Sequence, residues 1–263
     1  MDRRTLLRHF AASAACLCPV CGSLGVARSA AAEEHGGHPP HWSYEGHGGP
    51  QDWGSLAPEY GACGAGREQS PIDLAKSIPS MQADPSVSWL PRPLEIVNNG
   101  HTIQVNSTGG GTVVVDGISY DLLQFHFHHP SEHTVDGAPY DLEIHFVHKA
   151  ASGGLAVLGV LVTKGAANPT LETIWKSMPV KADETVHAEV MLQPSALLPA
   201  TGVTYRYAGS LTTPPCSEVV SWLVYSQPIT ASAEQIDRFA KLFPNNARPV
   251  QPLNRRKLLL DIL

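Results

Sequence analysis

Two short segments in which histidines alternate with apolar residues constrain the fold of this chain more than any other feature. Residues 124–128 read Gln-Phe-His-Phe-His, and residues 142–148 read Leu-Glu-Ile-His-Phe-Val-His. Successive side chains of a β-strand point to opposite faces, so His126 and His128 share one face and the phenylalanines share the other. An Asp-Gly turn signal between the segments favours antiparallel pairing. Paired in this way, the strands would bring His126, His128 and His145 to one point.

Three neutral imidazoles with an open fourth position are typical of a catalytic zinc site, whereas structural zinc sites close the shell with four ligands, usually cysteines. The polar residues Gln124 and Glu143 lie two positions before the first and third of these histidines. We expect them to accept the outer ring N–H groups and so orient the rings. Three other histidines fall on other faces or in loops, and we expect structural hydrogen bonds from them: His129, His133 and His148.

The rest of the chain reads as one mainly β (α+β) domain. Short β-branched runs separated by Gly, Asn and Asp turns predict strands. A capping box at Ser232 and Gln235 predicts a helix to about residue 243, and Asn168-Pro169 begins another. Residues 33–60 lack periodicity and are expected to form an irregular arm. The predicted strands are 94–97, 101–105, 112–115, 122–128, 142–148, 155–163 and 219–225.

The first 32 residues have the features of an export signal. A basic start with Arg3 and Arg4 precedes an uncharged stretch, and small residues end the segment at Ala32. The arginine pair resembles a twin-arginine signal, although Asp2 replaces the usual Ser or Thr, so general secretion and twin-arginine export both stay open. A retained anchor is disfavoured by the proline and glycines of the stretch. The sequence thus predicts a signal peptide at 1–32, a domain at 33–263, and a periplasmic or secreted protein.

The charge balance limits which partners the protein can bind, and the cysteine content predicts a disulfide. The chain has 24 acidic and 18 basic residues, a net charge of -6, and the predicted signal holds four of the arginines. This acidic balance argues against sequence-independent nucleic-acid binding and against docking on an anionic membrane after processing. Two cysteines, Cys63 and Cys216, follow the signal. In an oxidising compartment we expect one disulfide between them, with two free buried thiols as the alternative.

Together, the motifs resemble the alpha class of carbonic anhydrases over nearly the whole of residues 33–263. Each motif is weak alone, but their order and spacing are specific. The resemblance implies a large twisted, mostly antiparallel central sheet with short peripheral helices. The motifs are His41–Gly46, Gly49–Trp53, Gln69–Asp73, Asn98–His101, the His126/His128 strand, Ser131–Asp136, Leu155–Gly159, Ser210–Pro215, Trp222 and Arg248-Pro249.

The resemblance also implies an activity, the reversible hydration of CO₂ to bicarbonate. Zn²⁺ on the three histidines would generate a hydroxide that attacks CO₂. Thr212 would accept a hydrogen bond from that hydroxide and donate to Glu132, which orients the nucleophile. Thr213 would be a further polar contact. The implied apolar wall for CO₂ consists of Val147, Val157, Leu211 and Trp222.

The same resemblance assigns a proton pathway. His101 would carry the proton to solvent, since imidazole titrates near physiological pH. Tyr44, Asn99 and Gln104 match the positions that order water in this family. Paired cysteines and a homodimer are common among the bacterial members.

Two alternatives remain at this level. The spacing His126-x-His128-x-x-x-Glu132 fits one half of a cupin motif, in which the glutamate is a metal ligand. A non-catalytic periplasmic zinc-binding protein is the other. Replacement of Glu132 would distinguish the cupin from the carbonic anhydrase. In a cupin the glutamate is a ligand, so its loss should empty the metal site. In a carbonic anhydrase it orients the nucleophile, so its loss should leave zinc bound and slow turnover.

Overall fold

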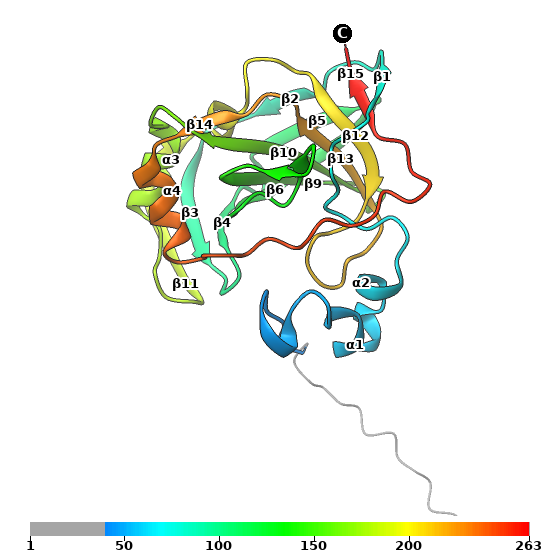
Figure 1. The fold of residues 1–263 in the computed structure, drawn as a ribbon. Coiled ribbons are helices and arrows are strands. Elements are labelled where there is room, and N and C mark those ends of the chain that lie inside the picture. The colour runs from blue at the N-terminus through cyan, green and yellow to red at the C-terminus, as the bar shows by residue number, and fades with distance from the viewer. Residues whose placement is uncertain (1–39, 263) are drawn as a thin grey trace, which may run out of the picture. The chain divides into compact units, whose positions relative to one another are not determined.

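The computed structural model describes residues 40–262, and the predicted export signal at 1–32 lies outside them. A 13-stranded sheet organises the described chain (Figure 1). The main path of the sheet runs, in spatial order, through β1 (Ile78–Ser80), β15 (Leu259–Asp261), β12 (Thr204–Gly209), β13 (Val220–Tyr225), β10 (Leu155–Lys164), β9 (Leu142–Ala150), β6 (Ile118–His128), β4 (Ile103–Asn106), β3 (Arg92–Asn98) and β11 (Glu184–Leu192).

Three more strands join this path at its flanks. β5 (Gly111–Val115) pairs with β6 and with β2 (Ser86–Trp89), and β14 (Ile229–Ala231) pairs with β10. Most pairs are antiparallel, while β1–β15, β10–β13 and β10–β14 are parallel. The expected large, mostly antiparallel sheet is therefore confirmed.

The Asp-Gly turn signal forms a small hairpin between the two histidine strands. β7 (Thr134–Val135) pairs with β8 (Ala138–Pro139), and both Asp136 and Gly137 have positive φ, at 50° and 79°. Such values fit the type I′ turns that glycine and aspartate favour. β6 and β9 on either side of the hairpin pair antiparallel, as the sequence predicts.

Alternation along the strands divides the core into two clusters. On one face Phe125, Phe127 and Phe146 are fully buried in the larger cluster. On the other face Val157 and Trp222 belong to a second cluster. Because the phenylalanines anchor one face of β6 and β9, the histidines between them must point to the opposite face.

Helices cover only parts of the sheet. α3 (Pro169–Lys176) and α4 (Ala233–Ala240) lie side by side near β11 in Figure 1, and the rings of Trp175 and Phe239 stack at 5.5 Å between them. The capping box at Ser232 and Gln235 is present, as predicted, although α4 ends three residues early. The remaining helical turns are short: η1 (Gly46–Gly48), α1 (Trp53–Leu56), η2 (Pro58–Tyr60), α2 (Ala62–Ala65) and η3 (Pro194–Leu197).

The expected irregular arm over residues 33–60 is correct in part for its described residues, which pack against the domain but also contain short helical turns. α1 and η2 form there, and the Trp53 side chain is fully buried against the disulfide of Cys63 and Cys216. Its indole N–H donates to the carbonyls of Ser43 and Gly48, each at 2.9 Å. Among the described residues, no helix is long and apolar enough to cross a membrane.

Candidate metal centre

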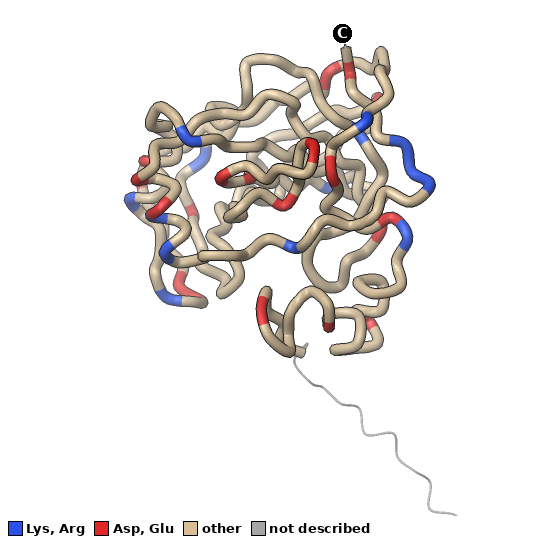
Figure 2. Tube along the Cα trace, in the orientation of Figure 1, with Lys and Arg blue, Asp and Glu red and all other residues tan. Residues whose placement is uncertain are grey.

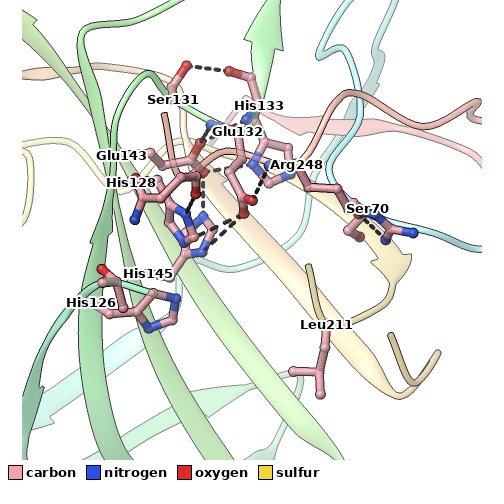
Figure 3. A network of polar contacts seen from close by, with 12 residues as sticks. Ser70, His126, His128, Ser131, Glu132, His133, Glu143, His145, Leu211 and Arg248 are labelled. Carbon is pink, nitrogen blue, oxygen red and sulfur yellow. Dashed lines mark hydrogen bonds and ion pairs between the residues drawn. The ribbon is translucent and has the colours of Figure 1, made fainter. Parts of the chain in front are cut away.

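Three histidine side chains converge on one face of the sheet. His126 and His128 come from β6, and His145 on β9 is directly opposite His126 in the strand register. One ring nitrogen of each lies within 4.8 Å of the others, which is close enough for all three to ligate one metal ion. Figure 3 shows the three rings grouped below Glu132 and Glu143.

Each ring is held by an acceptor on its outer nitrogen. His126 Nδ1 donates to Gln124 Oε1 and His145 Nε2 donates to Glu143 Oε1, both at 2.9 Å. The sequence predicts these two acceptors. It misses the third, because His128 Nδ1 donates at 2.8 Å to the backbone carbonyl of Asn246. The inner nitrogens are thereby left as the lone-pair donors.

The chemistry of the inner nitrogens fits a metal ion. His128 Nε2 is buried and has no hydrogen-bond partner in the described part of the chain. A buried polar atom without a partner is costly, and a metal would satisfy it. Burial and neighbouring imidazoles lower the pKa of His126, and burial lowers the pKa of His128 to about 4. Both rings are therefore neutral, as metal ligation requires.

A second group of potential ligand atoms is already occupied by hydrogen bonds. His133 and Glu143 lie close to His145, but Glu143 Oε1 accepts from His133 Nδ1 at 2.7 Å and from His145 Nε2 at 2.9 Å. His133 Nε2 in turn accepts from the Tyr207 hydroxyl at 2.6 Å. This group forms a buried support behind His145.

Glu132 faces the three histidines from the loop after β6. Its Oε1 accepts from the backbone N–H of Arg248 at 2.8 Å, while Oε2 lies 3.6 Å from His128 Nε2 and 3.8 Å from His145 Nδ1. Burial raises the pKa of Glu132 to about 7, although His145, Arg248 and the hydroxyl of Thr212 counteract this. Thr212 therefore lies beside the carboxylate. Within residues 40–262, however, no donor is close enough and well enough aligned to form a hydrogen bond to Oε2.

A polar cavity of about 120 Å³ opens beside the rings. The cavity is lined by all four residues assigned to the proton pathway, which are His101, Tyr44, Asn99 and Gln104. Thr213 also lines it.

The turn that carries His101 is fixed by its neighbours. Asn99 Oδ1 accepts from the backbone N–H groups of His101 and Thr102, at 3.0 and 2.9 Å. The His101 ring stacks on Trp42, with 3.7 Å between centroids and 7° between planes. Burial and the nearby His41 lower the pKa of His101. Sequence reasoning gave Trp42 no role, because its contact with His101 depends on how the N-terminal segment packs.

The apolar residues expected to contact CO₂ are also brought together. Val157 pairs with Val147 on one side and with Trp222 on the other, across β9, β10 and β13. Leu211 packs against the same cluster. The Trp222 ring lies 4.8 Å from that of His145, so this apolar surface borders the histidine group.

Three converging imidazoles, two buried and one half-buried, lie on a large sheet between a polar cavity and an apolar surface and could hold one metal ion. Comparison with known proteins then specifies the family. The profile described as eukaryotic-type carbonic anhydrase matches residues 48–261. The chain belongs to this family, the alpha class of carbonic anhydrases, and is an enzyme of it. The cupin alternative is therefore wrong.

Carbonic anhydrases from several bacteria have similar levels of identity to this chain. The chain is 45% identical over 221 residues to a carbonic anhydrase of Pectobacterium carotovorum, covering 83% of this chain and 90% of the relative. It is 46% identical over 224 residues to one of Nostoc sp., covering 83% and 85%. Among solved structures, the alpha-carbonic anhydrase of Thermovibrio ammonificans in complex with the inhibitor sulfanilamide superposes with a TM-score of 0.82 at 48% identity, covering 84% of this chain and 99% of that one.

Proposed function

We propose that this enzyme hydrates CO₂ reversibly to bicarbonate and a proton, with Zn²⁺ bound by His126, His128 and His145. The observation that carries the proposal is the convergence of one inner nitrogen from each of three neutral imidazoles, while the outer nitrogen of each ring donates a hydrogen bond elsewhere. When bound, zinc supplies Lewis acidity that makes water a nucleophile near neutral pH. Gln124 and Glu143 hold the ligand rings in the orientation that this requires.

Thr212 and Glu132 orient the nucleophile. Glu132 Oε2 is buried and has no hydrogen-bond partner among residues 40–262, so it can accept a hydrogen bond from the Thr212 hydroxyl after a small movement of either side chain. A threonine hydroxyl has one proton to donate. If the hydroxyl donates this hydrogen bond to Glu132, the Thr212 oxygen must accept a hydrogen bond from the attacking water, and one lone pair of the nucleophile is directed at the substrate.

The apolar surface of Val147, Val157, Leu211 and Trp222 binds CO₂. The substrate is nonpolar and the product is an anion, so an apolar surface retains the first and releases the second. Thr213 lies on the polar side of the site, where it can contact the product.

His101 removes the proton. It lines the same cavity as Tyr44, Asn99 and Gln104, whose polar groups can order the water between the reacting centre and the imidazole. Imidazole can accept a proton from this water and pass it to buffer at near-neutral pH.

Replacement of one ligand tests the proposal. His128→Ala should abolish both zinc content and CO₂ hydration, measured by metal analysis and stopped-flow with a pH indicator. His129→Ala is the matched control, because His129 is the next residue and donates instead to the carbonyl of Pro244 at 2.9 Å. Zinc-free protein with normal hydration activity would refute the proposal.

Export to an oxidising compartment is part of the same proposal. The disulfide between Cys63 and Cys216 supports it, because such bonds persist mainly in secreted and periplasmic proteins. The signal peptide at 1–32 and a homodimer stay predictions, which N-terminal sequencing of exported protein and light scattering would check.

A further inference from the structure

A larger cavity, lined by none of the residues discussed above as the metal centre, lies beside the C-terminal segment of the chain. Its volume is about 590 Å³. Figure 2 shows a continuous stretch of basic residues in this segment, which corresponds to the Arg-Arg-Lys run at 255–257. The residues that line the cavity are Arg67, Glu68, Asn254, Arg255 and Arg256.

The charge of this cavity opposes that of the chain. Three guanidinium groups face one carboxylate, while the whole chain has a net charge of -6. Arginine stays protonated at any physiological pH, so the excess is permanent. The other nearby carboxylate, Glu218, is engaged on Gln69, whose side-chain amide donates to it at 2.8 Å, and on the backbone N–H of Glu68 at 2.7 Å. Glu218 keeps its negative charge, so three guanidinium groups against the carboxylates of Glu68 and Glu218 leave an excess of one positive charge at the cavity.

The walls of the cavity are fixed before any ligand arrives. Asn254, at a positive φ of 56°, donates through Nδ2 to the carbonyl of Arg67 at 2.7 Å and joins the two sides. The Arg256 guanidinium donates to the carbonyls of Gln69 at 2.8 Å and Ala208 at 3.0 Å. Arg256 thus contributes charge and rigidity, with most of its N–H groups already used.

Unlike Arg256, Arg67 and Arg255 have guanidinium N–H groups that are available to a ligand. Both side chains are exposed, and within residues 40–262 neither guanidinium takes part in an ion pair or a side-chain hydrogen bond. Each can offer two parallel N–H groups to a planar or tetrahedral oxyanion, the geometry in which arginine binds phosphate most strongly.

We propose that this cavity binds a small oxyanion with two negative charges, of the phosphate or sulfate type. Arg67 and Arg255 donate the hydrogen bonds from the two walls, and Arg256 adds fixed charge between them.

Titration of the zinc-loaded protein with inorganic phosphate, followed by calorimetry at constant ionic strength set with chloride, tests the site. We expect saturable one-to-one binding. Arg67→Gln and Arg255→Gln should each weaken it by roughly tenfold, the usual scale for a lost charge-assisted hydrogen bond. CO₂ hydration should be unchanged, since neither residue lines the metal centre.

Lys257→Gln is the matched control. It removes one positive charge next to the site, but Lys257 does not line the cavity, so we expect roughly a twofold loss or less because solvent screens exposed charges. Absence of saturable phosphate binding in the wild type would overturn the proposal. Unchanged affinity in the double variant Arg67→Gln/Arg255→Gln would do so as well, since the anion would then bind elsewhere, for example at the metal centre.

Discussion

Replacement of Glu143 by glutamine should destabilise the protein far more than the loss of one charge suggests. The carboxylate is fully buried and accepts four N–H groups. Oε1 accepts from His133 Nδ1 at 2.7 Å and His145 Nε2 at 2.9 Å. Oε2 accepts from the backbone N–H groups of Glu132 at 2.9 Å and His133 at 2.8 Å. Although burial alone would raise it, the neighbouring imidazoles of His133 and His145 and their hydrogen bonds hold the pKa of Glu143 well below its usual value.

Glutamine keeps the shape but replaces one acceptor oxygen with an amide donor. Two N–H groups then face that donor and lose their partner. Each unsatisfied buried donor costs about 1–3 kcal/mol, so Glu143→Gln should lower the free energy of unfolding by about 2–6 kcal/mol. If the amide faces His145, this ring also loses its orientation, and zinc affinity should fall by roughly 10- to 100-fold.

Urea unfolding of the metal-free protein measures the first effect, and competition with a chromophoric chelator measures the second. Glu172→Gln is the matched control, because Glu172 makes only a partly exposed 3.5 Å ion pair with Arg238 and should change stability by less than about 0.5 kcal/mol. A Glu143→Gln protein within about 1 kcal/mol of wild type would refute the reasoning, because no two buried donors could then have lost their acceptor.

Three further predictions follow from other parts of the fold. His101→Ala should reduce turnover mainly in dilute buffer, and added imidazole should restore it; a variant insensitive to buffer would contradict the proton-transfer role. Burial lowers the pKa of His148 from 6.5 to about 4, so the unfolded chain binds a proton between these values that the folded chain does not. This difference should lower the free energy of unfolding by about 3 kcal/mol as pH drops from 6.5 to 4. In urea unfolding over the same pH range, the midpoint of His148→Phe should therefore fall less steeply than that of the wild type. Cys63→Ala/Cys216→Ala opens a loop with a sequence separation of 153 and should cost about 4–5 kcal/mol in urea unfolding, whereas equal stability with and without the disulfide would exclude the loop-entropy account.

Elements with clear alternation were predictable. The strands over 122–128, 142–148 and 155–163 correspond to β6, β9 and β10, which occupy the centre of the sheet. Central strands bury one face or both faces, so their sequences show either alternation of apolar and polar residues or a continuous apolar run.

The elements that sequence analysis missed lie mainly toward the edges. β11 (Glu184–Leu192) pairs with β3, and most of its side chains are exposed. The half-buried Val186 and Ala188 face the core, and a bulge between Ala188 and Met191 interrupts this short alternation. β1 and β15 have three residues each and form a parallel pair far apart in sequence. A strand this short gains its stability from its neighbour rather than from its own residues.

The sequence by itself determined which face of each strand carries the histidines, because side-chain alternation is a property of the extended backbone. It also determined that Gln124 and Glu143 support two of the rings, since each lies on the same strand as its partner. Only the tertiary structure decided what holds His128 and Glu132. The Asn246 carbonyl is 118 residues from His128, and the Arg248 N–H is 116 residues from Glu132. Every residue has a backbone carbonyl and all but proline an N–H, so their role depends on where the chain passes rather than on which side chain they carry.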